Sequence, residues 1–373
     1  MNKVVSRILG GFNPTNYGLS AEFLLTKMTQ MKGCGCKVPR AVLLELLKDL
    51  KSEGKADEIG IGLDSCVVPL RHDGLFLIQT TDFFYPLVDD PYLMGRVTCA
   101  NVLSDLYAMG VVDCDNMLIL LGVPKNISET ERDVVVSNFF SGFKDTATEA
   151  GTAVRGGQTV RCPWLLLGGV GTSVCRADEM AVVDEARPGD VLVLTKPLGG
   201  QVAVNSYEWL KCGNPRIEEL KLDKAKIVRA YEQVVEQMCR LNRNAARLTV
   251  KYGTHASTDV TGFGILGHAD NLAKAQKAEV QFVLHTLPII EYMAEISTAM
   301  GNGFNLFTGT SAETSGGLLI AVEKEKAVQL CSDMEELDGF PAWIIGDVIS
   351  GPRGAVIAED VKVISVPSRI HPN

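Results

Sequence analysis

Several features that would assign a function directly are missing from this chain of 373 residues. No apolar run approaches the ~18 residues that a membrane-spanning helix needs. The first residues contain no apolar segment long enough for a secretion signal. The formal net charge is −9, which argues against a nucleic-acid partner, because phosphate backbones bind basic surfaces. We therefore expect a cytoplasmic protein with no membrane partner and no nucleic-acid partner.

Common cofactor signatures are also missing. The ten cysteines lack the dense spacing of a disulfide framework, and no second close pair accompanies Cys34 and Cys36, as a zinc site would require. No P-loop motif occurs. Residues 262–267 fit Gly-x-Gly-x-x-Gly but follow a polar segment, and Glu279 begins the next strand instead of ending it, which contradicts a dinucleotide site. We interpret His268, at a helix start, as structural.

The segment 33–37, Gly-Cys-Gly-Cys-Lys, carries the most distinctive chemistry in the chain. Its glycines allow backbone angles and close approaches that a Cβ would prevent, so we expect a mobile loop. Cys34 and Cys36 are soft nucleophiles, and Lys37 is a cation that favours the thiolate, the reactive form of cysteine. Taken alone, the segment is equally compatible with two incidental cysteines in a flexible arm.

Chain length and the alternation of predicted strands and helices indicate an α/β (α+β) protein with two domains. Residues 1–37 are expected to form a mobile glycine-rich N-terminal arm that includes the cysteine loop. Residues 38–185 are expected to form the N-terminal domain, and residues 186–373 the C-terminal α/β domain.

Local signals place several elements within these domains. Asp90 followed by proline predicts a helix start, and Ser128 with Glu131 fits the capping box of another helix. The glycine pair in the segment 156–159 predicts a tight turn between two strands. Residues 223–252 predict a long helical region.

Four aspartates follow predicted strands, lie on a helix face or sit in a glycine-rich turn: Asp64, Asp82, Asp105 and Asp259. Carboxylates that converge from separate loops suit Mg²⁺, which prefers oxygen ligands and shares them with substrate phosphates. For each aspartate alone, an ordinary turn residue remains the alternative. Thr80 and Thr81 add hydroxyls, and the segment 156–159 adds exposed backbone N–H groups, both of which suit phosphate oxygens.

Seven short segments, in order from about residue 25 to 350, together resemble the selenophosphate synthetase family, and its eukaryotic branch most closely. They are Gly-Cys-Gly-Cys-Lys at 33–37, Gln-Thr-Thr-Asp at 79–82, Ala-Asn-Val-Leu-Ser-Asp at 100–105, Gly-Gly-Gln-Thr at 156–159, Leu-Thr-Lys-Pro-Leu-Gly at 194–199, Thr-Asp-Val-Thr-Gly-Phe-Gly at 258–264 and Glu-Thr-Ser-Gly-Gly at 313–317. One departure concerns Gln30, which stands where many bacterial members have histidine.

The resemblance implies the two-domain fold of the aminoimidazole ribonucleotide synthetase superfamily, with N-terminal strands that form a barrel across a homodimer. It implies the conversion of ATP, selenide and water to selenophosphate, AMP and phosphate, with Mg²⁺ as cofactor, to supply selenium for selenocysteine synthesis. A transient contact with enzymes of selenocysteine synthesis is a further expectation.

By motif position, the resemblance also implies roles for single residues. Cys34 and Lys37 are the expected catalytic residues, and Lys37 reaches the ATP phosphates. The expected Mg²⁺ ligands are Asp64, Asp105 and Asp259. The expected nucleotide contacts are Lys37, Gly62, Leu63, Asp64, Thr80, Thr81, Asp82, Asp105, Gly156, Gly157, Gln158 and Thr159.

Two alternatives stay open at this point. One is a related small-molecule kinase of the same superfamily, against which the Gly-Cys-Gly-Cys-Lys loop speaks. The other is a non-catalytic ATP-binding paralogue that regulates selenium or redox metabolism, against which the retained Cys34 speaks.

Overall fold

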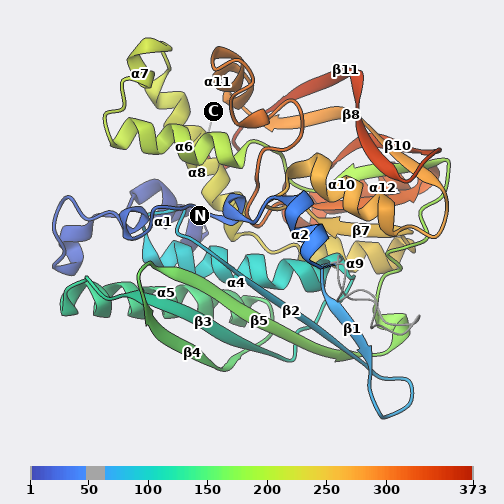
Figure 1. The fold of residues 1–373 in the computed structure, drawn as a ribbon, viewed down its shortest axis with the longest axis horizontal. Helices are drawn as coiled ribbons and strands as arrows, with labels where there is room; N and C mark the ends of the chain where they lie inside the picture. Colours follow the sequence, from blue (N-terminus) through green and yellow to red (C-terminus); the bar gives the residue numbers. More distant parts are fainter. Residues whose placement is uncertain (1, 48–63, 372–373) are drawn as a thin grey trace.

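The computed structural model describes residues 2–47 and 64–371 and contains two β-sheets (Figure 1). The first sheet has the order β1-β2-β5-β3-β4 and the second the order β11-β8-β10-β6-β9-β7. The strands of the first are β1 (Cys66–Pro69), β2 (Phe76–Phe84), β3 (Asn116–Pro124), β4 (Val154–Cys162) and β5 (Leu166–Cys175). Those of the second are β6 (Asp190–Leu194), β7 (Ala256–Asp259), β8 (Val280–Ile290), β9 (Leu318–Glu323), β10 (Trp343–Ser350) and β11 (Gly354–Val366). The fold is therefore mixed α/β, with one sheet in each half of the chain.

Helices α4 (Pro91–Ala108) and α5 (Glu129–Glu149) lie along one face of the first sheet (Figure 1). Both predicted starts are confirmed, because Asp90 caps α4 through the N–H groups of Tyr92 and Leu93, and Ser128 opens α5 with a capping box. A Cβ on Gly95 or Gly142 would collide with the backbone of the facing helix. These two glycines thus let the helices approach closely, and α4 is buried along almost its whole length.

The glycine pair at 156–157 lies inside β4, so the predicted tight turn is wrong. Gly157 pairs with Ile119 of the parallel strand β3, and a Cβ on Gly157 would collide with the backbone of Ile119. The glycine is required here by a close approach between two strands. Strand β4 forms one edge of the sheet, and most of its residues are exposed.

The first 32 residues contain regular structure, contrary to the predicted mobile arm. Helix α1 (Lys3–Gly10) buries Val4 and Ile8, and the Arg7 guanidinium forms an ion pair with Asp90 at 2.6 Å. Short 3-10 helices follow at Pro14–Tyr17, Leu25–Met28 and Cys34–Cys36. The apolar pattern of α1 covers only two turns, which is too short to stand out in the sequence.

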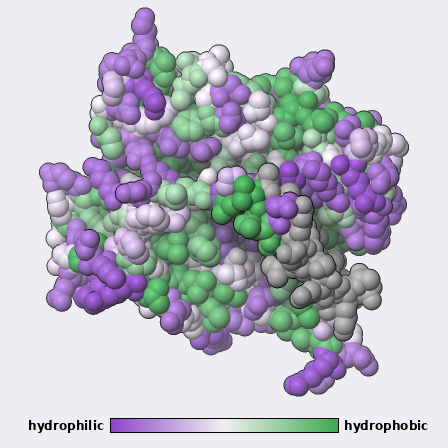
Figure 2. All heavy atoms as spheres, in the orientation of Figure 1, coloured by the Kyte–Doolittle hydropathy of each residue, from purple (hydrophilic) through white to green (hydrophobic). Residues whose placement is uncertain are grey.

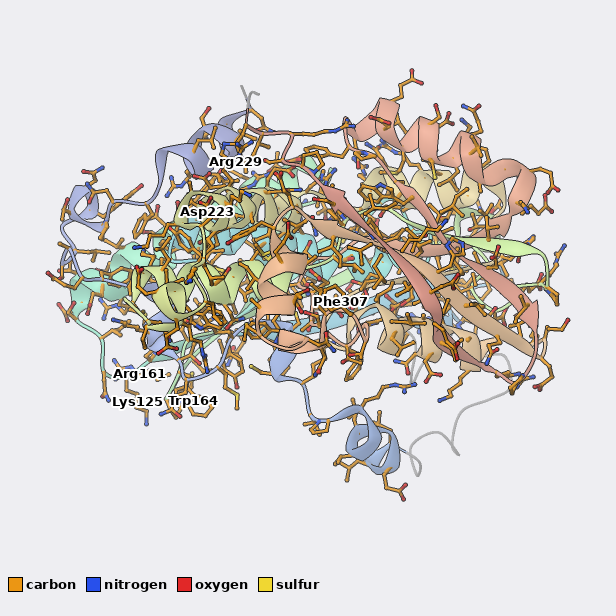
Figure 3. All side chains as sticks on the ribbon, turned by 90° about the horizontal axis from the view of Figure 1, so that it is seen from above. Lys125, Arg161, Trp164, Asp223, Arg229 and Phe307 are labelled. Carbon is orange, nitrogen blue, oxygen red and sulfur yellow. The ribbon has the colours of Figure 1, made fainter. Side chains whose placement is uncertain are left out.

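Helix α2 (Arg40–Leu46) follows the cysteine loop and projects from the body of the protein (Figure 3). The Arg40 guanidinium anchors it through Asp270 at 2.5 Å and Asn271 at 2.7 Å. Val42 and Leu46 are exposed, and Figure 2 shows a hydrophobic patch at this helix.

The other helices of the described residues belong to the second half of the chain: α6 (Gly200–Lys211), α7 (Arg216–Glu219), α8 (Lys224–Cys239), α9 (Arg243–Tyr252), α10 (Gly264–Ala275), α11 (Met293–Ala299) and α12 (Lys324–Asp338). The predicted helical region 223–252 is two helices. Between them, the Asn242 side chain donates to Ser104 Oγ and to the carbonyl of Gly316, so the break serves a buried contact between both halves. No helix of the described residues is both long and apolar enough to cross a membrane.

Candidate active site

The four predicted aspartates converge on one cavity of about 260 Å³, which we call the acidic pocket. Asp82 comes from β2, Asp105 from α4, Asp259 from the end of β7, and Asp64 from the residues just before β1. Lys37, directly after the cysteine loop, lines the same pocket. The further lining residues are Arg40, Leu43, Leu47, Thr81, Thr258, Thr261, Phe263, His268, Asn271 and Leu272. The site thus combines residues from both halves of the chain.

Hydrogen bonds orient three of the carboxylates. Asp64 Oδ1 accepts from Thr258 Oγ1 at 2.9 Å, and Asp105 accepts from the hydroxyl of Thr80. Asp82 Oδ2 accepts from the Asn101 amide at 2.5 Å. Thr80 therefore acts behind the pocket wall, whereas Thr81 lines the pocket itself.

Two carboxylate oxygens are left over. Asp64 Oδ2 and Asp259 Oδ2 are buried and have no hydrogen-bond partner among the described residues. A buried unpaired carboxylate oxygen is costly unless a cation or a donor satisfies it. The pair therefore fits a divalent cation that takes oxygen ligands, as Mg²⁺ does.

The carboxylates also raise one another's pKa. Burial raises the pKa of Asp259 to about 6, and burial together with Asp259 raises the pKa of Asp64 well above its usual value. The pKa of Asp105 is raised in the same way. Burial alone would lower the pKa of Lys37, but Asp82 and its neighbours outweigh burial and raise it. Arg40 also lines the pocket but is paired with Asp270, so Lys37 alone does not balance the four carboxylates and the pocket favours added positive charge.

His268 also lines the acidic pocket, whereas its place at a helix start suggested only a structural role. Its ligand atom and those of Asp64 and Asp259 lie within 4.8 Å of one another. The backbone N–H of Phe263 donates to His268 Nε2 at 3.3 Å, and burial lowers the pKa of the ring to about 3, so the imidazole is neutral. Its position in the first turns of α10, shortly after Asp259, is the sequence signal that could have found it.

The cysteine loop closes one side of the acidic pocket. Cys34 is 2% exposed, and its Sγ lies 3.8 Å from Asn101 Oδ1. Its backbone N–H faces Thr314 Oγ1 at 3.4 Å, and a Cβ on Gly262 would collide with the Cys34 carbonyl. The loop is therefore held against α4, the 313–317 segment and the turn before α10.

The Cys34 thiol does not have the lowered pKa that the nearby Lys37 led us to expect. Burial and Asp82 raise the pKa of Cys34, whereas Lys37 lowers it by less. In this closed arrangement Cys34 is a thiol rather than a thiolate.

The segment 313–317 connects the loop to the second sheet. The Ser315 N–H donates to Asn101 Oδ1 at 2.7 Å, and Ser315 itself adopts a left-handed backbone with φ 46°. Lys196 holds this turn by donating from Nζ to the Ser315 carbonyl at 2.9 Å. Asn101 and Lys196 stand in the motifs quoted above, but their sequence positions gave no sign of this contact.

The glycine segment 156–159 lies elsewhere in the chain. Gly156, Gly157, Gln158 and Thr159 line a separate cavity of about 450 Å³ beside α5. Strands β5 and β3 separate β4 from β2, which carries Asp82, so one chain does not bring these expected nucleotide contacts to the acidic pocket. Gly62 and Leu63 lie outside the described residues.

Family models match both halves of the chain. The family "AIR synthase related protein, N-terminal domain" matches residues 62–174, and "AIR synthase related protein, C-terminal domain" matches residues 187–359. A Caenorhabditis elegans protein named "Probable selenide, water dikinase" is 62% identical, over 99% of this chain and 100% of the relative. Homo sapiens "Selenide, water dikinase 2" is 50% identical, over 96% of this chain and 87% of the relative.

Solved structures support the fold. "AaThiL complexed with AMPPCP and TMP" superposes with a TM-score of 0.63 at 19% identity, covering 87% of this chain and 94% of that chain. Proteins of low sequence identity therefore share this fold. The high sequence identities, by contrast, are to proteins named selenide, water dikinase. The chain belongs to the selenide, water dikinase family, within the AIR synthase related proteins.

Proposed function

We propose that the protein converts ATP, selenide and water to selenophosphate, AMP and phosphate, and so supplies selenium for selenocysteine synthesis. The observation that carries the proposal is the contact between the Cys34 loop and the acidic pocket. Asn101 links the buried thiol to the site for metal-bound phosphates. Its amide donates to Asp82 of the acidic pocket, and its Oδ1 faces the Cys34 thiol. The two relatives named above carry the name of this activity at 62% and 50% identity.

Asp64, Asp105 and Asp259 would hold Mg²⁺, with Asp82 beside them. The metal would neutralise charge on the ATP phosphates. The two unpartnered oxygens of Asp64 and Asp259 support this assignment.

Lys37 would place its ammonium on the polyphosphate. It lines the acidic pocket, and its raised pKa keeps it charged throughout the neutral range. Phosphoryl transfer depends chiefly on positioning and electrostatic stabilisation, so a fixed cation beside the metal ligands suits that chemistry. Thr81 supplies a hydroxyl at the same wall.

Cys34 would meet selenide. A buried sulfur offers a soft group to a soft selenium anion, while the oxygen ligands of the acidic pocket suit hard metal ions and phosphates. Asn101 fixes the position of the Cys34 thiol relative to the Asp82 carboxylate, because it binds Asp82 and faces Cys34.

The segment 156–159 would reach a nucleotide only in a second copy of the chain. We propose a homodimer through the first sheet, with a barrel formed by strands of both chains, in which this segment completes the partner's acidic pocket. Exposed apolar side chains support the dimer: Val68, Phe83, Val160 and Val174 on that sheet, and Trp164 in the connection between β4 and β5. Figure 3 shows Lys125, Arg161 and Trp164 together at the end of strands β3 and β4.

The wider expectations remain part of the proposal. They are the division of the chain at 37 and 185, a cytoplasmic location and a transient contact with enzymes of selenocysteine synthesis. Two alternatives do not account for the Cys34 thiol beside the acidic pocket. They are an ATP-binding paralogue without activity and another small-molecule kinase.

Chromatography of the nucleotide products, with and without selenide under anaerobic conditions, tests the proposal. The expected result is AMP that accumulates in proportion to added selenide. Formation of ADP with a different acceptor would favour the kinase alternative. Binding of Mg·ATP without turnover would favour the non-catalytic one.

A further inference from the structure

A second cavity of about 340 Å³ lies on the other side of the cysteine loop, and we call it the loop pocket. Cys36 lines the loop pocket, whereas the next residue, Lys37, lines the acidic pocket. Gly33 and Gly35 also line the loop pocket. The loop of residues 33–37 therefore forms a thin wall between two cavities.

The loop pocket is lined by soft groups. Met31, Cys36 and Met238 contribute sulfur to its wall. Among the described residues that line the acidic pocket, none carries sulfur. Soft ligands such as thiol and thioether favour soft partners, whereas carboxylates favour hard cations, so the two pockets suit different ligands.

The Cys36 thiol is held in place at this wall. Its Sγ lies 3.0 Å from the Lys32 carbonyl and accepts from the Lys32 N–H at 3.1 Å. Thr314 lines the same pocket, and its hydroxyl lies 3.4 Å from the backbone N of Cys34. Thr314 therefore connects the wall of the loop pocket to the backbone of Cys34 through one hydrogen bond.

Charge separates the two pockets further. Four carboxylates line the acidic pocket, so an anion is favoured there only when it brings cations with it, as Mg·ATP does. The loop pocket has a cation in its wall, Lys32, which pairs with Glu208, and the first residues of α6 line it. The positive end of a helix favours an anion, although the first N–H groups, those of Gly199 and Gly200, are already taken by Glu313.

We propose that hydrogen selenide, a small soft anion, reaches the Cys34 loop through the loop pocket, from the side opposite to Mg·ATP. The inference rests on the proposed function and adds a route and a site for its selenium substrate. Cys36 and the two methionines contact the selenium, and Lys32, paired with Glu208, lies in the same wall. Displacement of the glycine-rich loop then brings the two substrates together.

A series of larger side chains at Asn205 tests the route. Asn205 lines the loop pocket from α6. The variants Asn205→Leu, Asn205→Phe and Asn205→Trp fill the cavity progressively, so the smaller ones remain informative if the largest does not fold. Val328→Trp, at a 70% exposed position on α12, is the matched control for added bulk.

The expected result is a KM for selenide that rises with side-chain size, by at least ~10-fold for Asn205→Trp, while the KM for ATP stays within ~2-fold. Val328→Trp should match the wild type in both constants. An unchanged KM for selenide across the series contradicts the route. A wild-type protein that makes no selenophosphate contradicts the proposed function itself, so the two failures are distinguishable.

A second measurement locates selenium directly. Crystals of the wild-type protein soaked anaerobically with selenide should show anomalous selenium density beside Cys36 and Thr314. Density confined to the acidic pocket, or none in the loop pocket at selenide concentrations above KM, would overturn the proposal.

Discussion

Cys34 and Asn101 face each other across the two halves of the site, with Sγ 3.8 Å from Oδ1. The same asparagine donates to Asp82 and accepts from the Ser315 N–H. One fully buried side chain thereby sets the position of the thiol, a carboxylate of the acidic pocket and the 313–317 turn.

Replacing that asparagine tests its positioning role. Asn101→Ala should lower kcat for selenophosphate formation by ~100-fold with a smaller change in the KM for ATP, because the groups stay but lose their alignment. It should also cost about 1–3 kcal/mol of unfolding free energy, since the Ser315 N–H loses its buried acceptor. Asn138→Ala on α5 is the control. A kcat close to the wild type would remove Asn101 from the site.

The metal ligands are tested by removing charge at constant shape. Asp64→Asn, Asp105→Asn and Asp259→Asn should each abolish Mg²⁺-dependent ATP turnover while leaving the fold intact, because an amide lacks the charge that a hard cation needs. Calorimetric titration with Mg²⁺ and ATP checks binding separately from turnover. Near-normal turnover in one variant would exclude that residue as a ligand.

In the absence of metal, Asp259→Asn should stabilise the fold although it abolishes turnover. The pKa of Asp259 is raised from 3.8 to about 6, so its charged form is disfavoured in the folded state. The resulting destabilisation is complete above pH 6 and disappears as pH falls towards 3.8. Metal-free Asp259→Asn should therefore be more stable than the wild type at pH 8, by up to ~3 kcal/mol. Urea unfolding at pH 8 and pH 5 checks this, and an equal difference at both values would contradict it.

The loop residues should differ in their effects. Lys37→Ala should lose ~100–1,000-fold in turnover, because a preorganised cation is removed. Cys34→Ser should bind Mg·ATP but make little selenophosphate, since a hydroxyl is a hard group. Cys36→Ser should be far milder and act mainly on the KM for selenide. Reducing conditions are needed, because oxidation of the two thiols would mask the difference. If Cys36→Ser is inactive and Cys34→Ser makes selenophosphate normally, Cys36 rather than Cys34 is the catalytic cysteine.

The proposed homodimer can be tested by complementation. Asp64→Asn and Gln158→Ala should each be inactive, and mixing the refolded chains should restore part of the activity. A mixed dimer has one site without either substitution when each site combines Asp64 of one chain with Gln158 of the other. Sedimentation of a monomer at micromolar concentration, or no recovery on mixing, would contradict the shared site.

Much of the site is predictable from sequence because its residues stand at the ends of recognisable elements. Asp82 on a strand and Asp105 on the helix that Asp90 opens needed only local signals. The contact of Asn101 with Ser315 spans more than two hundred residues, and no local pattern encodes it. The strand position of Gly157 could not be predicted, because a glycine required by strand packing looks the same in sequence as a glycine required by a turn.

The pKa of Cys34 shows a second limit of the sequence. Lys37 stands three residues away and favours the thiolate, but the burial that outweighs it comes from elements distant in the chain. The place of His268 in the acidic pocket could not be predicted for the same reason. Its proximity to Asp64 exists only after the two halves pack together.

The proposed reaction forms a bond between phosphorus and selenium. Phosphorus NMR of an anaerobic mixture of protein, Mg·ATP and ⁷⁷Se-labelled selenide measures that bond directly. We predict a new phosphorus signal split by one-bond coupling to ⁷⁷Se, with AMP and phosphate formed in equal amounts. Consumption of ATP without any selenium-coupled signal would contradict the account.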